Sequence, residues 1–199
     1  MPASPIENEA NIIRAAQRGS LDDFNTLVRH YQDAVFSLAY RMMGDTYEAS
    51  DVAQDAFITA YRKLGTYRGG NFRSWLLRIC TNLCYDAMRR EKRRPTISMD
   101  ELAPSPEEDA PLPDPSMTPE QIAERREMER AVQACISALS PDQRVVLVLS
   151  DIEGFDYQSI ADQLDTALGT VKSRLSRARA SIRECLQSVG ELLPAQFRL

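Results

Sequence analysis

Histidine is nearly missing from this sequence, and cysteines at metal-binding spacing are missing altogether. His30 is the single histidine, and the four cysteines (Cys80, Cys84, Cys135 and Cys185) include no CxxC pair. Because a structural zinc site needs four Cys or His ligands, we expect no metal and four free, mostly buried thiols. Phosphate-binding glycine loops and nucleophile–base pairs are absent too, so we expect neither a cofactor nor an enzyme.

Long apolar runs are absent as well. No stretch approaches the roughly eighteen apolar residues that a membrane-spanning helix needs. The first residues, MPASPIENEANIIR, lack the basic segment followed by an apolar one that marks a secretion signal. We therefore expect a cytoplasmic protein.

The charges that are present are unevenly distributed along the chain, although the net charge is only −5. Residues 62–94 hold ten basic and two acidic residues, and residues 96–129 hold ten acidic and two basic ones. Residues 166–183 then contain five basic residues and no acidic one. Two basic blocks divided by an acidic one predict two surfaces for a polyanion such as DNA.

Proline divides the chain into two parts. Residues 104–119 contain six of the eleven prolines and almost no large apolar side chains. Because proline removes a backbone donor and fixes φ, we expect an extended, acidic linker there. The sequence thus predicts an all-α protein with two small helical domains, at residues 10–95 and 120–190, joined by a flexible linker at 96–119.

Apolar spacing predicts the helices of both domains. In the first, residues recurring three and four apart predict a helix up to Gly44-Asp45, a second over about 47–64 and a third over about 72–90. In the second domain, Ser140-Pro141-Asp142-Gln143 has the capping-box pattern of a helix start. A short helix at 157–164, a turn at 165–169 and a basic helix to about 186 then have the outline of a helix-turn-helix.

The basic helix carries its polar side chains on one face. The predicted buried stripe consists of residues spaced four, three and four apart: Val171, Leu175, Ala178 and Ile182. The side chains that project away from the stripe are those of Lys172, Ser173, Ser176, Arg177 and Arg179. A solvated basic face is the alternative, but such faces usually include acidic partners at i,i+4, and none occurs before Glu184. Because arginine can donate two hydrogen bonds to guanine, we predict DNA recognition.

Aromatic and basic residues alternate along the helix at 72–90 and in the loop before it. Aromatic rings and cations together suit single-stranded nucleic acid, in which bases stack and phosphates need neutralising. The alternative is that Trp75 and its apolar neighbours form core. We expect core for Trp75 and DNA contact for the polar residues near the loop, which are Asn71, Arg73 and Asn82.

The helix at 47–64 carries an acidic stripe. Its members lie three to four residues apart: Asp45, Glu48, Asp51 and Asp55, with Gln54 beside them. No histidine lies nearby in the sequence, so a metal site or acid–base chemistry fits poorly. A solvated face and a docking face for a basic or polar protein both remain open.

Three motifs occur together in one known family. They are YEASDVAQDAFITAYRKL, then YRGGNFRSWLLRICTNLCYDAMRR, then LSPDQRVVLVLSDIEGFDYQSIADQL followed by GTVKSRLSRARASI. Over nearly all of residues 20–186 the chain resembles bacterial RNA polymerase sigma factors of the extracytoplasmic-function type. The resemblance implies two domains, sigma regions 2 and 4. It also implies a transcription initiation factor that binds core polymerase, reads the −35 and −10 promoter elements and promotes strand opening.

The resemblance implies roles for individual residues too. Docking on the clamp helices of the polymerase's largest subunit would involve Asp51, Gln54, Asp55 and Phe57. The −10 strand would be captured and held by Tyr67, Arg68, Asn71, Phe72, Arg73, Asn82, Arg89 and Arg90. The −35 element would be read by Lys172, Ser173, Ser176 and Arg177, with Arg174 and Arg179 on phosphates. The implied partners are core polymerase, through its clamp helices and flap, promoter DNA and an anti-sigma factor.

Two positions depart from the family pattern. The turn reads Leu164-Asp165 where Leu-Gly is usual, and Ala167 replaces the usual serine N-cap, which should cost about 1 kcal/mol. A helix-turn-helix regulator that binds duplex DNA without polymerase is the alternative function. That alternative leaves the acidic helix and the aromatic, basic helix unexplained.

Overall fold

The computed structural model describes residues 6–93 and 118–188, and all regular structure within these ranges is helical. The N-terminal unit (residues 6–93) contains α1 (Glu9–Gln17), α2 (Leu21–Met43), α3 (Thr46–Lys63), the short turn η1 (Leu64–Thr66) and α4 (Phe72–Arg93). The C-terminal unit (residues 118–188) contains α5 (Pro119–Ser137), α6 (Pro141–Leu147), the π-helical turn η2 (Val148–Ile152), α7 (Tyr157–Gln163) and α8 (Leu168–Ser188). The all-α prediction is confirmed. The predicted linker, up to residue 117, lies outside the described residues.

Helix caps explain why the N-terminal unit breaks where it does. The Ser20 hydroxyl accepts a hydrogen bond from the Asp23 N–H at the start of α2. The helix ends at Gly44, which has a φ of 84° and donates its N–H to the Tyr40 carbonyl at 2.8 Å. Asp45 then caps α3 by accepting from the Glu48 N–H at 2.9 Å. The predicted break is confirmed, and the Asp45 carboxylate serves as a helix cap.

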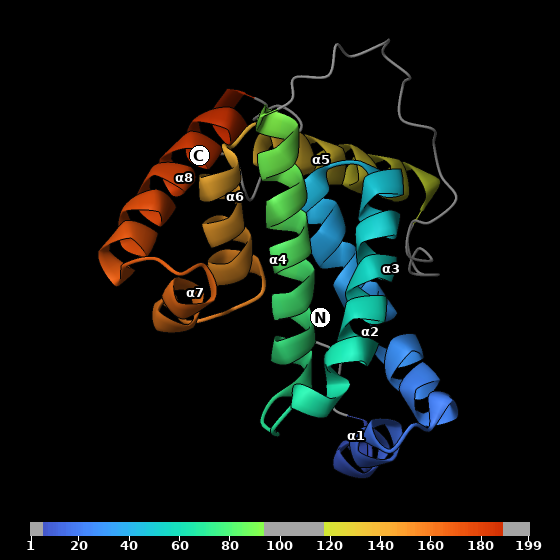
Figure 1. Ribbon diagram of the computed structural model, residues 1–199. Helices are drawn as coiled ribbons and strands as arrows, with labels where there is room; N and C mark the ends of the chain where they lie inside the picture. The colour runs from blue at the N-terminus through green and yellow to red at the C-terminus, as the bar shows by residue number, and fades with distance from the viewer. Residues whose placement is uncertain (1–5, 94–117, 189–199) are drawn as a thin grey trace.

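Three long helices form the core of the N-terminal unit. α2, α3 and α4 pack against one another, and α1 lies across the end where η1 leads into the α3–α4 loop (Figure 1). The face of α3 that meets its neighbours is made of small buried residues: Ala49, Ala53, Ala56 and Ala60. Opposite them, α2 and α4 supply larger fully buried side chains such as Leu38, Met42 and Leu77.

The C-terminal unit contains the predicted helix-turn-helix. Val171, Leu175 and Ala178 of α8 are buried, Ile182 is half-buried, and the predicted stripe is confirmed. Asp165 takes a φ of 47° in the turn, the left-handed conformation in which aspartate is tolerated better than most residues. The predicted side-chain capping at Ser140 is wrong, because the Gln143 N–H donates to the Ser140 carbonyl at 3.0 Å and the hydroxyl accepts no cap bond. A capping box occurs instead between Thr118 and Gln121 at the start of α5.

The prediction of four free thiols is wrong for two of them. Cys135 of α5 and Cys185 of α8 form a disulfide, with their Cα atoms 5.8 Å apart. The two residues are 50 positions apart in sequence, and only the packing of α5 against α8 brings them together. Cys80 and Cys84 are free and buried, as expected. Hydrogen bonding with Cys84, together with burial, raises the pKa of the Cys80 thiol well above its usual value.

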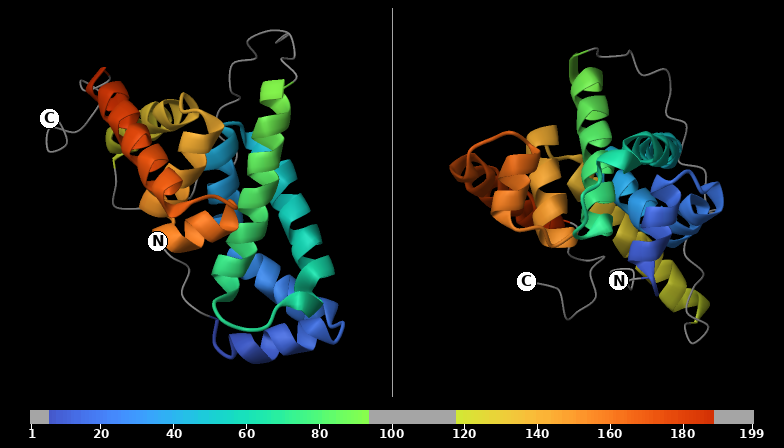
Figure 2. Two further views of the ribbon diagram at one scale, coloured as in Figure 1. Left: turned by 60° about the vertical axis from the view of Figure 1, so that its left-hand side comes forward. Right: turned by 60° about the horizontal axis from the view of Figure 1, so that its bottom comes forward.

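The two units share one continuous apolar core. α4 lies between α2 and α3 on one side and the helices α6, α7 and α8 on the other (Figures 1 and 2). A second contact between the units is made by α5, which packs against α2. Gly44 belongs to that contact, since a Cβ atom there would lie 2.5 Å from the Ser137 hydroxyl oxygen. The glycine is therefore needed both for its positive φ and for the close approach of α5.

Candidate nucleic-acid interface

An aromatic cluster supports the loop between α3 and α4. The ring centroids of Tyr67, Phe72 and Trp75 lie 5.4 Å from one another in each pair. Phe72 is only 1% exposed, whereas Tyr67 and Trp75 are half-buried. Trp75 therefore packs on the core, as expected. The ring of Phe72, which the resemblance assigns to DNA, is covered by protein in this conformation.

The loop itself is exposed and held by short-range hydrogen bonds. The Tyr67 hydroxyl donates to the Gly70 carbonyl at 2.7 Å, and the Asn71 side chain accepts from the Ser74 N–H at 2.9 Å. Gly69 and Gly70 have φ values of 99° and 98°, in a backbone region that favours glycine. Arg68 and Asn71 are exposed, so both side chains are within reach of a ligand outside the protein.

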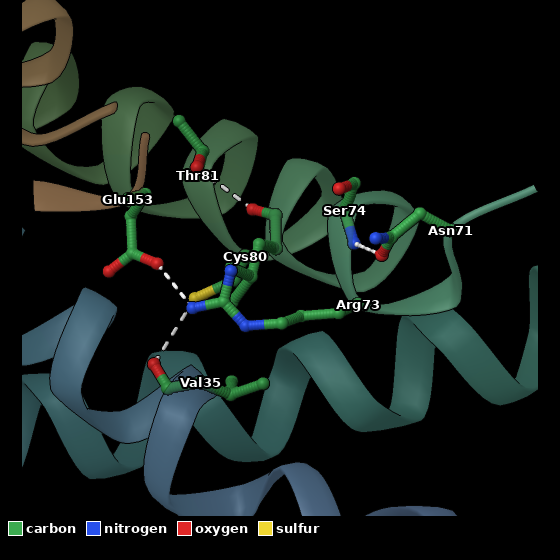
Figure 3. A network of polar contacts seen from close by, with 8 residues as sticks. Val35, Asn71, Arg73, Ser74, Cys80, Thr81 and Glu153 are labelled. Atoms are coloured by element: carbon green, nitrogen blue, oxygen red, sulfur yellow. Dashed lines mark hydrogen bonds and ion pairs between the residues drawn. The ribbon is translucent and has the colours of Figure 1, made fainter. Parts of the chain in front are cut away.

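Basic and polar residues of α4 continue this surface away from the loop. Asn82, Arg89 and Arg90 are exposed, and the Arg89 guanidinium lies 5.4 Å from the centre of the Tyr85 ring. Arg73 differs from them, because its guanidinium donates to the Glu153 carboxylate of the C-terminal unit at 2.7 Å (Figure 3). The Arg73 and Glu153 side chains are 21% and 7% exposed, so this ion pair lies largely between the units.

Three tyrosines near this surface have raised pKa values. Burial, followed by hydrogen bonding to Glu9, raises the pKa of Tyr31, and burial with the nearby Glu9 charge raises that of Tyr67. Burial and the hydrogen bond that its hydroxyl donates to Asp142 raise the pKa of Tyr85. Because tyrosine normally titrates near pH 10, all three hydroxyls remain hydrogen-bond donors at neutral pH.

The outward face of α8 exposes the predicted −35 residues. Lys172, Ser173, Ser176 and Arg177 are all exposed, and Arg177 donates to the Ser173 carbonyl at 3.2 Å. A shallow hollow of about 410 Å³ between α7 and α8 is lined in part by Lys172 and Ser176. This half of the helix therefore presents a continuous polar and basic face.

Two arginines of α8 are held by carboxylates. Arg179 makes two hydrogen bonds to Asp151, at 2.8 and 2.7 Å. These bonds lower the pKa of the Asp151 carboxyl, and they raise the pKa of Arg179. Arg174 pairs with Asp142 at 3.0 Å, and the same carboxylate accepts the hydrogen bond from Tyr85 of α4. Arg174 is half-buried and Arg179 is exposed, and each is paired with a carboxylate.

α3 presents an exposed face that combines acidic and apolar residues. Asp51, Gln54 and Asp55 are exposed and Phe57 is half-buried. The same helix exposes Tyr47 (73%), Ile58 (42%) and Tyr61 (40%). These three residues were not predicted from the sequence. The sequence did carry a signal for them. These large apolar side chains lie outside the stripe of buried alanines on α3, at positions where exposing apolar surface is costly.

The described residues provide no evident metal site. Within residues 6–93 and 118–188, no three His, Cys, Asp or Glu side chains are grouped so that they could hold a metal ion. In the same part of the chain, every helix is too short or too polar to cross a membrane.

Known proteins similar to this chain belong to one family. The sigma-70 region 2 family matches residues 27–94 and the sigma-70 region 4 family matches residues 129–182. The ECF RNA polymerase sigma factor SigE of Mycolicibacterium smegmatis is 38% identical over 169 residues, covering 85% of this chain and 63% of the relative. The RNA polymerase sigma-H factor of Pseudomonas aeruginosa is 39% identical over 184 residues, covering 91% and 95%.

A solved structure has the same arrangement of helices. The sigma factor RpoE in complex with the anti-sigma factor NepR from Bartonella quintana is 28% identical and superposes with a TM-score of 0.61. The superposition covers 83% of this chain and 98% of that one. The shared fold therefore extends over both the N-terminal and the C-terminal unit.

Proposed function

This chain belongs to the sigma-70 family, and on that premise we propose that it is an ECF-type transcription initiation factor. It binds core RNA polymerase and directs it to promoters by reading the −35 and −10 elements. The observation that carries the proposal is the presence of two separate basic surfaces, on α8 and around the α3–α4 loop, beside the exposed acidic and apolar face of α3. It acts by binding, without catalysis of its own, in the cytoplasm where polymerase works.

The −35 element is read by the outward face of α8. The major groove of B-DNA admits one α-helix, and the buried stripe on the opposite face fixes which side chains enter it. Arg177 and Lys172 reach base edges, and the small Ser173 and Ser176 let the helix approach closely. Arg174 and Arg179 neutralise phosphates after exchanging their carboxylate partners for the backbone of the DNA.

The −10 element is captured as a single strand by the α3–α4 loop. Arg68 and Asn71 are exposed on the loop, and Asn82, Arg89 and Arg90 extend the path along α4. Unstacking of one base is offset by hydrogen bonds to its edges and by charge neutralisation of the phosphates. Arg73 joins this path once it leaves Glu153, and the Phe72 ring supports the loop from beneath.

The α3 face is the docking surface for core polymerase. Asp51, Gln54 and Asp55 supply charge and hydrogen-bonding groups for the clamp helices, and Phe57 supports them from the partly buried side. Tyr47, Ile58 and Tyr61 add the apolar area that gives an interface its stability. The C-terminal unit reaches the flap. An anti-sigma factor is a further proposed partner, because the similar RpoE is bound by NepR.

This assignment divides the chain into a −10 domain at residues 10–95, a linker at 96–119 and a −35 domain at 120–190. The two basic blocks of the sequence then lie in different domains, and the acidic block lies between them. Such a division suits two DNA elements that are separated along the promoter.

In vitro transcription tests the proposal. Purified chain is added to core polymerase on a genomic template, and the start sites are sequenced. We expect initiation at sites that share −35 and −10 sequences. Asp55→Ala should lower affinity for core, and Arg177→Ala should weaken use of the −35 element by about tenfold, as loss of one good base contact does.

The exposed Asp33 of α2 provides the matched control, and Asp33→Ala should change neither property. Tight, sequence-specific binding to duplex DNA by the chain alone, without promoter-specific initiation, would instead establish the independent helix-turn-helix regulator.

A further inference from the structure

One side chain of α1 holds the start of the α3–α4 loop. The Gln17 amide nitrogen donates to the Leu64 carbonyl and to the Tyr67 carbonyl, each at 3.0 Å. A side-chain amide has two N–H groups, so both donors of Gln17 are used. The two acceptors lie at the first and last points of the turn that leads from α3 into the loop. Gln17 therefore fixes the position from which the loop departs.

Gln17 joins α1 to this part of the backbone by hydrogen bonds, and the tip of the loop beyond it is exposed. The Cβ atoms that substitutions would add at Gly69 and Gly70 would meet nothing within 4 Å. Other bonds are local: the Tyr67 hydroxyl donates to the Gly70 carbonyl, the Tyr67 N–H donates to the Leu64 carbonyl, and Asn71 caps α4. These bonds lie within the loop and the helical turns on either side of it, so they set its shape. The bonds from Gln17, together with the packing of the Tyr67 ring on Phe72 and Trp75, set its place on the molecule.

α1 is itself attached firmly enough to act as a support. Ile13 and Ala16 are 5% and 3% exposed and belong to the core. Glu9, at the other end of the helix, accepts a hydrogen bond from Tyr31, whose ring centre lies 5.7 Å from that of Phe72. α1 thus bonds at one end to Tyr31, which lies beside the aromatic cluster, and at the other end to the backbone where the loop begins. In Figures 1 and 2, α1 lies next to the end of the unit that carries this loop.

We propose that Gln17 is a positioning residue for −10 recognition: it sets the loop at residues 67–71 so that Asn71 and Arg68 meet the captured base. Gln17 lies outside residues 27–94, to which the region 2 family corresponds. A hollow of about 380 Å³ between α1 and the loop is lined by Gln17 together with Tyr67 and Arg68. A shift of the Tyr67 carbonyl would change this wall and displace the loop. The inference rests on the proposed function.

The chemistry of the contact predicts how substitutions rank. Gln17→Met keeps the length of the side chain and removes both donors. Gln17→Glu places a carboxylate against two carbonyl oxygens, which repels them, so its effect should be larger. Gln17→Lys restores donors through its ammonium group. Its added charge strengthens all DNA binding alike, so it is judged by base discrimination, in which that charge cancels.

The experiment uses holoenzyme and the −10 strand of a promoter mapped by start-site sequencing. Fluorescence anisotropy measures binding of the single-stranded oligonucleotide and of versions with one base replaced at a time. Gln17→Met should weaken binding about fivefold, as loss of hydrogen bonds of this kind does. The loss should concentrate at the base whose recognition Asn71→Ala also removes. Gln17→Lys should recover discrimination at that base. Gln32→Met, the same change at an exposed glutamine of α2, is the matched control and should have no effect.

The outcomes separate this inference from the proposed function. If Asn71→Ala leaves −10 binding unchanged, the proposed role of the loop is wrong. If Asn71→Ala weakens it and Gln17→Met does not, only the role of Gln17 is wrong. Equal losses at every base, or a matching loss of affinity for core polymerase or −35 duplex, would show general destabilisation and overturn the inference. If the Gln17→Met variant fails to fold, Gln17→Glu and Gln17→Lys test the role of Gln17 by the same binding measurements.

Discussion

At the scale of single residues, carboxylates of the C-terminal unit hold three of the arginines that are assigned to DNA. Glu153 pairs with Arg73, Asp142 with Arg174, and Asp151 with Arg179, at distances of 2.7 to 3.0 Å. Each pair keeps a guanidinium ordered, and each carboxylate would compete with a phosphate for the charge of that guanidinium. The pairs differ in exposure, so their contributions to stability differ as well.

Asp151 provides a prediction about pH. Its pKa lies below the ordinary value of about 3.9 because Arg179 hydrogen-bonds its charged form. The pair therefore contributes fully above about pH 4, and its contribution is lost as the pH falls through the lowered pKa. The side chains are 49% and 31% exposed, so Asp151→Asn should lower the free energy of unfolding by only about 0.5 kcal/mol at pH 7.

Urea unfolding from pH 7 to pH 3 measures this difference. The difference in the free energy of unfolding between Asp151→Asn and the unmodified protein should shrink toward zero below about pH 4. The control Asp33→Asn should stay close to the unmodified protein at every pH. A difference that persists unchanged at pH 3 would contradict the role of the Asp151 charge.

At the scale of elements, α3 depends on its N-cap. Asp45 satisfies the Glu48 N–H, which has no partner within the helix. Asp45→Ala should lower the free energy of unfolding by about 1 kcal/mol, and Asp45→Ser should preserve most of it because serine is also a good cap. Urea unfolding of the two variants decides the point. Equal stability of the alanine and serine variants would show that the cap is unimportant.

The disulfide ties α5 to the C-terminal part of α8, the helix that is proposed to read DNA. Because it closes a loop of about 50 residues, removing it should cost about 2 to 4 kcal/mol. A reducing agent should therefore lower the urea midpoint of the oxidised protein. The variant with both Cys135→Ser and Cys185→Ser should start from the lower midpoint and not respond to the reductant. Four free thiols in the denatured, oxidised protein would refute the bond.

The sequence predicted α2, α3, α4, α6, α7 and α8 from apolar spacing together with helix-start and turn signals. It missed α1 and α5 for a physical reason. α1 buries only Ile13 and Ala16, and α5 buries residues near its C-terminal end only, at Gln133, Cys135 and Ile136. Helices whose stability comes from a few tertiary contacts leave no repeating pattern in the sequence.

The exposed residues of the candidate site were largely predictable, and their partners were not. Spacing from the buried stripe placed Lys172 and Arg177 on the outward face of α8. Nothing in the sequence indicated that Gln17 bonds to the loop 50 residues away or that Arg73 pairs with Glu153 80 residues away. Such pairs depend on how helices pack, which local patterns do not encode.

At the scale of the whole molecule, the contact between the units links the two surfaces that are proposed to bind DNA. Arg144 of α6 donates to the Met42 carbonyl of α2, and Gln133 of α5 donates to the carbonyls of Tyr40 and Arg41 at 3.3 and 3.4 Å. Arg73 of the proposed −10 surface pairs with Glu153 of the C-terminal unit, whereas Arg174 of the proposed −35 surface pairs with Asp142 of its own unit. Because Arg73 is tied to the other unit in this way, the function proposed above predicts that the Arg73–Glu153 pair opens when the −10 strand binds.

Glu153→Gln tests this closed arrangement. Glu153 is 7% exposed, and neutralising it leaves the largely buried Arg73 without its countercharge, at a cost on the order of 2 kcal/mol to the contact. The units of the free protein should then separate more often, so the radius of gyration from small-angle X-ray scattering should rise. Binding of the −10 strand by the free protein should strengthen, while holoenzyme, in which both units already contact polymerase, should be unaffected.

Glu129→Gln is the matched control, because Glu129 pairs with Arg125 on an exposed face of α5. A rise in the control as large as that in Glu153→Gln, or unchanged scattering and DNA binding in Glu153→Gln, would show that the ion pair does not hold the units together.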